Sequence, residues 1–542
     1  MSKSKSNFLI QGGILALAGL LSRLIGLIYR IPLNNVLGNE GIGYYSNAYS
    51  VYSIFLLISS TSLPVAVSKI VSARMAKKEA YNAKRAFAGA MIFAVIAGGL
   101  CTSIVFFGAD FFAELWKYPS MSMALRVLAP TIFVVCVLGV FRGFFQGLGT
   151  MVPTALSQIF EQIVNAIVSV AAAVLLFDIG SKYDEAAAYS AAGGTLGTLL
   201  GAISALLFMG YVYILYKPTL DRKIRKDKVS VPETNSELSK ILLVTIVPVL
   251  LSTTIYNVSS IIDSALFGNI MSSVFNMEEA AYSSLYGIYS GKYTLLTTAP
   301  IAISSALASA IIPSLIRSLA NGNKGELLNK IDSSIRMSMI VAIPCGVGIS
   351  VLAEPFCYLL FPDKEMMDVC ILLMRFAVLK IVVYSLSTIT NSILQGVDKM
   401  SKPVINSTIS LAIHIVLVVV LLVVFKMDII GVLIADVVFA FVVCILNSIC
   451  IRRYTGYRQE MIKTFVIPFI CAGIMGLVSF FVYKGVNALI HIYAVALVVS
   501  VIVAILIYAF FLVLFKGVDE NELMAMPKGH IIIKFYKKLH LM

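Results

Sequence analysis

Two segments far apart in the chain repeat one pattern: YSNAYSVYSIFLLISSTSLPVAVSK at residues 45–69 and YSSLYGIYSGKYTLLTTAPIAISS at residues 282–305. Their tyrosines align at one constant offset, Tyr45, Tyr49 and Tyr52 with Tyr282, Tyr286 and Tyr289. Further matches follow in the same order, ADFFAEL (109–115) with AEPFCYL (353–359) and QGLGTMVP (146–153) with QGVDKMSKP (395–403). Three ordered pairs indicate that the chain consists of two homologous halves.

The repeated segments begin long apolar runs, which recur along the whole sequence. Of the 542 residues, 59% are hydrophobic and 13% charged, whereas a globular domain has roughly 45–50% apolar and about 25% charged residues. Runs of about 20 apolar residues predict an all-α integral membrane protein. Fourteen transmembrane helices are predicted near residues 8–33, 44–70, 86–108, 123–146, 153–177, 187–216, 240–268, 284–316, 336–361, 367–395, 403–425, 429–451, 464–484 and 490–515.

Lysines and arginines gather in alternate loops, near residues 3–5, 69–85, 217–240, 317–336, 399–402, 452–463 and 516–538. The loops between them carry single lysines: Lys117, Lys182, Lys292, Lys364, Lys426 and Lys484. This asymmetry predicts that both termini are cytoplasmic. It also accounts for the net charge of +14 by loops that face anionic lipid, so nucleic-acid binding is not expected.

Because each half has an even number of spans, the halves are predicted to be parallel repeats that form two lobes. The expected organisation is a six-helix lobe over 1–216, a basic cytoplasmic connector over 217–239, a second six-helix lobe over 240–452, helices thirteen and fourteen over 453–515, and a cytoplasmic tail over 516–542. Two such lobes can rock to open a central cavity to either side of the membrane in turn.

Several kinds of chemistry lack their motifs in this sequence. The eight cysteines stand singly, the four histidines form no HExxH pair, and no GxxxxGK[ST] loop is present. We therefore expect neither an enzyme nor a nucleotide-driven pump, and no metal site or resident cofactor. Coupling to sodium or protons stays open.

The first span keeps two arginines, Arg23 and Arg30. An arginine near the middle of a membrane helix costs about 2.5–3.5 kcal/mol on insertion scales, so it usually faces a partner or a watery interior. The two arginines lie two helical turns apart and share a face. We expect Arg23 to bind an anionic, amphipathic cargo, with pairing to a buried acid as the alternative, and Arg30 either to join it or to reach the interface.

Other charges within or beside the spans are further candidates. Lys292 occupies the repeat position of Phe55, so the packing of the repeat does not require its charge, and we expect it to face the cavity. The acids within spans are Glu161, Asp263, Glu354 and Asp436. Each is interpreted as the partner of a basic or hydroxyl group, with ion coupling as the alternative. Structural or interfacial roles are expected for Arg126, Arg142, Arg375 and Lys380.

A family resemblance covers essentially the whole chain, carried by SRLIGLIYR (22–30), LPVAVS (63–68), APIAIS (299–304), AEPFCYLLF (353–361) and QGVDKMSKP (395–403). These segments resemble polysaccharide-type transporters of the multidrug/oligosaccharidyl-lipid/polysaccharide (MOP) superfamily, within it the stage V sporulation protein B branch and the related MurJ-type lipid II flippases. The resemblance implies fourteen helices in two lobes plus a final pair, whose groove would hold a polyprenyl tail. It also implies outward flipping of an undecaprenyl-pyrophosphate-linked peptidoglycan precursor across the cytoplasmic membrane. We expect the protein to act as a monomer.

The resemblance also implies site residues. In MurJ-type proteins helix one carries SRxxGxxR, whose arginines line the cavity; Ser22, Arg23 and Gly26 match here, whereas Tyr29 fills the second arginine position and Arg30 follows it. Lys292 fills the helix-eight arginine position, and the helix-two arginine has no counterpart in residues 54–60. A sodium site of some members maps to Asp263 and Asn406, with Ser410 in place of a further acid.

Three other functions remain open on the same fold. One is export of another lipid-linked polysaccharide unit, which would use the same cationic cavity. Another is a multidrug cation antiporter, which would need carboxylates in the first lobe where the first span offers arginines. A scaffold without transport activity would tolerate replacement of the intramembrane charges.

Overall fold

The computed structural model describes residues 2–59, 63–230 and 258–518, and the chain divides into two compact units, residues 1–291 and 292–542. Within the described ranges no strand occurs, and eleven helices are long and apolar enough to cross a membrane. These observations confirm the prediction of an all-α, multi-pass membrane protein. Helices suit a membrane span because their backbone groups pair within the segment. The count of fourteen spans is compatible with the structure, because residues 2–59 contain two predicted spans that meet at a kink and the span at 240–268 lies partly outside the described residues.

The first unit begins with α1 (Ser2–Ser59), in which two helices meet at a kink. It contains both the predicted span at 8–33 and the start of the span at 44–70, with a kink at Gly38 instead of a loop. Gly38 has φ +66°, a conformation that a residue without Cβ adopts at little cost. The break at Gly38 lies between the two spans that the sequence predicts, so two helices meet there as expected, without a longer loop.

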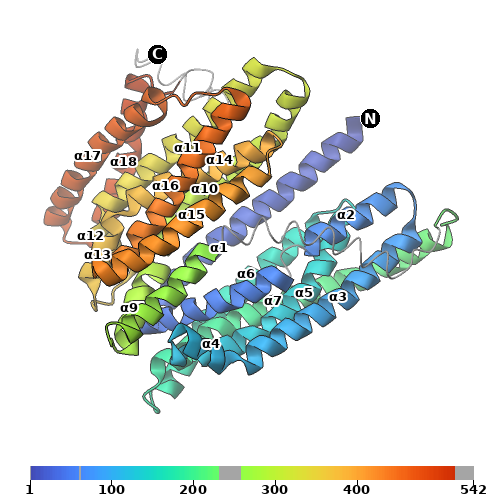
Figure 1. Cartoon of the computed structure of the whole chain (residues 1–542), viewed down its shortest axis with the longest axis horizontal. Helices are drawn as coiled ribbons and strands as arrows, with labels where there is room; N and C mark the ends of the chain where they lie inside the picture. Colours follow the sequence, from blue (N-terminus) through green and yellow to red (C-terminus); the bar gives the residue numbers. More distant parts are fainter. Residues whose placement is uncertain (1, 60–62, 231–257, 519–542) are drawn as a thin grey trace. The chain divides into compact units, whose positions relative to one another are not determined.

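The helices that follow α1 in the first unit are α2 (Leu63–Ala76), α3 (Ala80–Phe107), α4 (Ala109–Trp116), α5 (Ser122–Gly147), α6 (Val152–Gly180), α7 (Ala186–Arg225), a helix over residues 258–273, and α9 (Glu279–Gly287). Four of them, α3, α5, α6 and α7, match the predicted spans at 86–108, 123–146, 153–177 and 187–216, while the short helix α4 was not predicted as a span. Helix α5 packs against α2, α3 and α7, and these helices run side by side in the first unit (Figure 1).

Glycines bring α6 and α7 into close contact. Gly193, Gly197 and Gly201 recur every fourth residue on α7 and face α6. A Cβ at Gly197 would lie 2.7 Å from the Cα of Ser169, and one at Gly201 would lie 2.7 Å from the carbonyl oxygen of Glu161. Small residues in this spacing let membrane helices approach to backbone contact, so α6 and α7 are a fixed pair.

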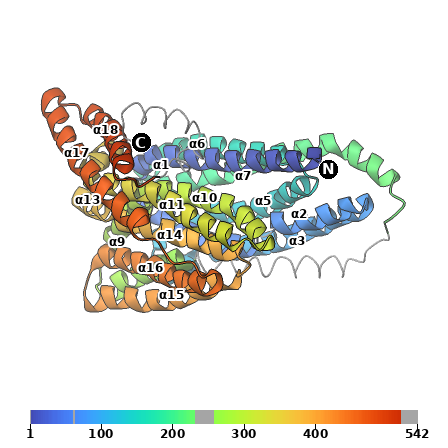
Figure 2. The same cartoon turned by 90° about the horizontal axis from the view of Figure 1, so that it is seen from above.

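The second unit consists of a bundle and a pair of helices at its C-terminal end. Its helices are α10 (Thr294–Ala320), α11 (Lys324–Val351), α12 (Ala353–Leu360), α13 (Met367–Arg375), α14 (Ala377–Gly396), α15 (Ser401–Val419), α16 (Asp428–Thr455), α17 (Ile467–Ile490) and α18 (Tyr493–Leu514). Helices α15 and α16 lie side by side (Figure 1 and Figure 2). The pair α17 and α18 packs on α11, where the Tyr508 hydroxyl donates to the Ile340 carbonyl at 2.9 Å.

The internal repeat reappears in the backbone of each unit. ADFFAEL lies in α4 and AEPFCYL in α12, both eight-residue helices that follow a long one. Gly149 and Asp398 both have positive φ, +83° and +60°. The residue after each donates its N–H five positions back, from Thr150 to Phe145 and from Lys399 to Leu394. The equivalent segments therefore end their helices with the same turn. The predicted domain boundaries stay a prediction, since the connector at 217–239 lies partly outside the described residues.

Candidate functional site

Arg23 is exposed on α1. Among the residues that the structure describes, it has neither a hydrogen bond nor an ion pair. The nearby Gly26 faces α6, where a Cβ would lie 3.6 Å from the Gln162 side-chain oxygen. Because the Arg23 guanidinium projects from an apolar helix and has no carboxylate partner in the described ranges, its positive charge is uncompensated. An anion can neutralise such a charge.

Tyr29 stands at the position of the second arginine in the SRxxGxxR pattern, and Arg30 follows it. Tyr29 is buried, and its hydroxyl accepts a hydrogen bond of 3.0 Å from the amide of Asn165 on α6. Arg30, one position later, is exposed, and its electrostatic neighbours are the phenols of Tyr29, Tyr45 and Tyr49. Successive residues on a helix point in directions about 100° apart. The Tyr29 side chain therefore contacts α6, and the Arg30 side chain lies on a different side of α1.

Glu161 on α6 pairs with a cation of the neighbouring helix α5. Nη2 of Arg142 lies 2.7 Å from Oε2 of Glu161, and Nε of Arg142 donates to Oγ of Ser157 at 2.9 Å. The two charged side chains are only 14% and 22% exposed. Glu161 therefore acts as a charge partner in this structure, one of the two roles expected for it.

The second unit contains a more deeply buried pair between α14 and α16. Nζ of Lys380 lies 2.9 Å from Oδ2 of Asp436, and Lys380 also donates to Oγ1 of Thr294 at 3.3 Å. The Tyr384 hydroxyl donates to the other carboxylate oxygen, and the rings of Tyr293 and Tyr384 lie 5.2 and 5.6 Å from the ammonium. The sequence singled out both charged residues but not their pairing; opposite charges in the middle of two spans were the available signal.

Lys292 lies in the π-helical segment Ile288–Tyr293 and is 2% exposed. Its Nζ is 5.4 Å from the centroid of the Phe361 ring. The thiols of Cys357 and Cys370, whose sulfur atoms are 3.4 Å apart, are among its electrostatic neighbours. Within the described ranges Lys292 forms no ion pair. Its other electrostatic neighbours are the carboxylates of Asp363 and Glu365.

The residues of the expected sodium site are buried in their own units. Asp263, 1% exposed, lies on the helix over residues 258–273. Asn406 on α15 donates to Oδ1 of Asn447 at 2.8 Å, and Asn447 donates in turn to Oδ1 of Asn391 at 2.8 Å. Ser410, which stands in place of a further acid, donates to the Phe439 carbonyl at 2.6 Å. These amides form a buried network in the second unit.

Glu354 differs from the other acids because it is exposed, in the first turn of α12. Its electrostatic neighbour is Tyr483 on α17. Across the part of the chain that the structure describes, no three histidine, cysteine, aspartate or glutamate side chains gather where they could hold a metal ion.

Comparison with known proteins places these features in a family. The family described as "Polysaccharide biosynthesis protein" matches residues 9–319, and the family described as MatE matches residues 248–420. The first match spans more than half of the chain.

Individual relatives align with most of the chain. The chain is 26% identical to the lipid II flippase MurJ of Bacillus subtilis (strain 168) over 492 residues, 87% of this chain and 88% of that protein. It is 23% identical to stage V sporulation protein B of the same organism over 536 residues, 98% and 100% of the two chains. A solved structure of the lipid II flippase MurJ in an inward closed conformation superimposes with a TM-score of 0.66 at 14% identity, covering 92% of this chain and 98% of that one.

Proposed function

The chain belongs to the polysaccharide biosynthesis protein family of the MOP superfamily, and on this premise we propose that it flips a lipid-linked oligosaccharide pyrophosphate across the cytoplasmic membrane. It is a membrane transporter and not an enzyme. The proposed cargo is an undecaprenyl-pyrophosphate-linked peptidoglycan precursor of the lipid II type, which moves from the inner to the outer leaflet by alternating access. We further propose that the protein acts as a monomer with both termini in the cytoplasm.

The observation that carries the proposal is Arg23, an exposed guanidinium on an apolar helix with no acidic partner in the described ranges. Guanidinium groups bind phosphate oxygens through two parallel hydrogen bonds, which replace the water that a pyrophosphate loses when it enters the bilayer. In the proposed mechanism Arg23 is the principal headgroup ligand. Arg30, exposed two turns further along α1, adds a second positive charge.

Lys292 has a conditional role in this mechanism. Its ammonium is buried against Phe361, so it reaches the cargo only in a conformation in which the segment Ile288–Tyr293 has moved. A π-helical turn is a frequent place for such a rearrangement, because its extra residue loosens the hydrogen-bond ladder.

Two sources of driving force are compatible with these residues. Outward movement of an anion along an inside-negative potential is favourable by about 2.3 kcal/mol per charge per 100 mV. Sodium or proton coupling through Asp263 and Asn406 is the second source that we propose, since both residues are buried and offer oxygen ligands. Replacement of external sodium by choline, with Asp263→Asn as the matched variant, separates the two sources.

The decisive experiment replaces Arg23 in a strain whose own flippase is depleted. Arg23→Ala is expected to abolish growth and to accumulate the lipid-linked precursor on the inner leaflet, while Arg23→Lys rescues partly because the charge remains without the bidentate geometry. Arg126→Ala is the control, since Arg126 forms an exposed pair with Asp110 and such pairs contribute little. Normal growth of a correctly inserted Arg23→Ala variant would contradict the proposal.

A second cargo is favoured by the family match itself, whose description names polysaccharide biosynthesis. In that case the chain exports another polysaccharide unit on the same lipid carrier. Identification of the lipid-linked intermediate that accumulates after depletion distinguishes the two, because the pyrophosphate is common to both cargoes and only the glycan differs.

A further inference from the structure

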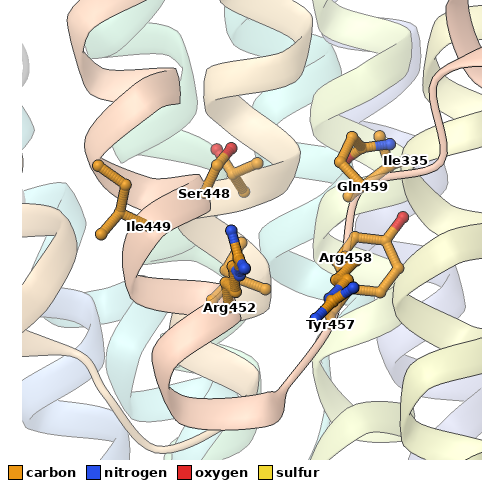
Figure 3. A pocket seen from close by; sticks show the side chains of 9 residues that line it. Ile335, Ser448, Ile449, Arg452, Tyr457, Arg458 and Gln459 are labelled. Atoms are coloured by element: carbon orange, nitrogen blue, oxygen red, sulfur yellow. The ribbon is translucent and has the colours of Figure 1, made fainter.

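A pocket of about 420 Å³ lies in the second unit where α16 ends (Figure 3). Ser448, Ile449 and Arg452 border it from the last turns of α16, and Tyr457 and Arg458 from the segment that follows. Ile335 of α11 closes the apolar side. Its volume falls within the range of small-ligand sites, roughly 300–1,000 Å³.

Two guanidinium groups at this pocket lack a counter-charge. Arg452 and Arg458 are both exposed, and neither forms an ion pair with any residue of the described ranges. The acid that contacts Tyr457 of this pocket is already engaged, because Asp332 accepts a hydrogen bond of 2.8 Å from the Tyr457 hydroxyl and lies 3.5 Å from Nη2 of Arg336. Among the residues that the structure describes, the pocket therefore carries positive charge without a carboxylate paired to either arginine.

Glu460, two residues after Arg458, is engaged as well. Its carboxylate accepts backbone hydrogen bonds from Ile462, Lys463 and Thr464 at 3.0, 3.0 and 2.9 Å, at the start of the helix that leads into α17. Burial by itself would raise the pKa of Glu460, but these hydrogen bonds outweigh it and the pKa is lowered. The carboxylate stays ionised and bound to its own helix, so it does not compete for the two arginines.

The pocket lies where an apolar surface of α16 meets these charges. Phe441, Ile445 and Ile449 follow each other at intervals of four residues and are 53%, 44% and 57% exposed. An exposed apolar stripe of this kind on a membrane helix is suited to contact with acyl chains. Arg452 follows Ile449 by one helical turn, so an acyl chain along this stripe would bring its headgroup to Arg452.

We propose that this pocket binds the phosphate of an anionic phospholipid headgroup, with Arg452 and Arg458 on the phosphate oxygens and the acyl chain along the stripe of Phe441, Ile445 and Ile449. The Ser448 hydroxyl is positioned as a further donor from the same wall. A free phosphate offers the same oxygens to the arginines but no group for the apolar stripe, so the stripe favours the lipid. The leaflet is the cytoplasmic one if the orientation in the proposed function holds, whereas binding itself is independent of orientation and cargo.

The test uses the purified full chain and measures how many lipid molecules it retains in native mass spectrometry after equilibration with phosphatidylglycerol or phosphatidylcholine. The double variant Arg452→Gln/Arg458→Gln is expected to weaken retention of phosphatidylglycerol about tenfold or more, with no change for phosphatidylcholine. Arg453→Gln is the matched control, because Arg453 is exposed on the same helix but does not line the pocket. The variant Arg452→Lys/Arg458→Lys keeps the charge and is expected to retain most of the binding, which separates lost charge from lost folding.

The second arm adds inorganic phosphate at millimolar concentration. Persistence of phosphatidylglycerol binding supports the lipid proposal, since free phosphate lacks the apolar contact. Displacement by phosphate alone, or equal retention of the two lipids by the wild-type chain, overturns it. An equal loss of binding in Arg453→Gln and in the double variant also overturns it, because the effect would then be general surface charge.

Discussion

Nζ of Lys380 lies 2.9 Å from Oδ2 of Asp436, and the two side chains are only 8% and 7% exposed. Removal of one partner from a buried ion pair leaves an uncompensated charge and typically costs about 3–5 kcal/mol. Asp436→Asn is therefore expected to destabilise the second unit by about that amount, measured as thermal unfolding of the protein in nanodiscs.

The matched double variant Lys380→Met/Asp436→Leu should be more stable than Asp436→Asn, because it removes both charges together. If Asp436→Asn unfolds at the wild-type temperature, the pair contributes nothing to stability.

Gly197 sets the distance between α6 and α7. Gly197→Val is expected to cost about 1–3 kcal/mol through overpacking, since a Cβ there would meet the backbone of Ser169. Gly210→Val on the same helix is the control, because no atom lies within 4 Å of its Cβ position. Equal unfolding temperatures for the two variants would show that α6 and α7 can move apart without loss of stability.

Glu460 gives the stability a pH dependence. Its pKa is lower in the folded protein than the ordinary value of about 4.3, so its contribution is complete above that value and is lost as the pH falls through the folded pKa. At pH 7 Glu460→Gln is expected to lose about 1 kcal/mol, as for a lost helix cap. The difference in the free energy of unfolding between wild type and Glu460→Gln should shrink towards pH 3. A difference that grows on acidification would contradict a lowered pKa for Glu460.

The Arg142 and Glu161 pair predicts that Glu161 is not an ion-coupling residue. Because Nη2 of Arg142 lies 2.7 Å from its carboxylate, the charge of Glu161 is already neutralised. Glu161→Gln should lower stability but leave the dependence of transport on external sodium unchanged. The exchange Arg142→Glu/Glu161→Arg should recover part of the stability, and a loss of sodium dependence in Glu161→Gln would contradict this interpretation.

Much of the architecture could be predicted from the sequence. Apolar runs predicted the helices because a membrane span must be long and apolar to satisfy its backbone in lipid. The repeat predicted two homologous halves, and the structure shows an equivalent turn with positive φ in each, at Gly149 and at Asp398. At Gly38 the sequence predicts a break between two spans, and the structure makes that break with a single residue of positive φ instead of a longer loop.

The sequence by itself determined that the chain is an all-helical membrane protein with a twofold repeat and a small set of intramembrane charges. The tertiary structure alone decided the partners of those charges: Lys380 pairs with Asp436, and Arg142 pairs with Glu161. Within the described residues Arg23 has no such partner. It also placed Lys292 in the interior and Tyr29, not Arg30, against α6. The physical reason is that the partner of a charge depends on the helix faces that meet, and contacts between residues distant in sequence, such as Gly197 with Ser169, fix those faces.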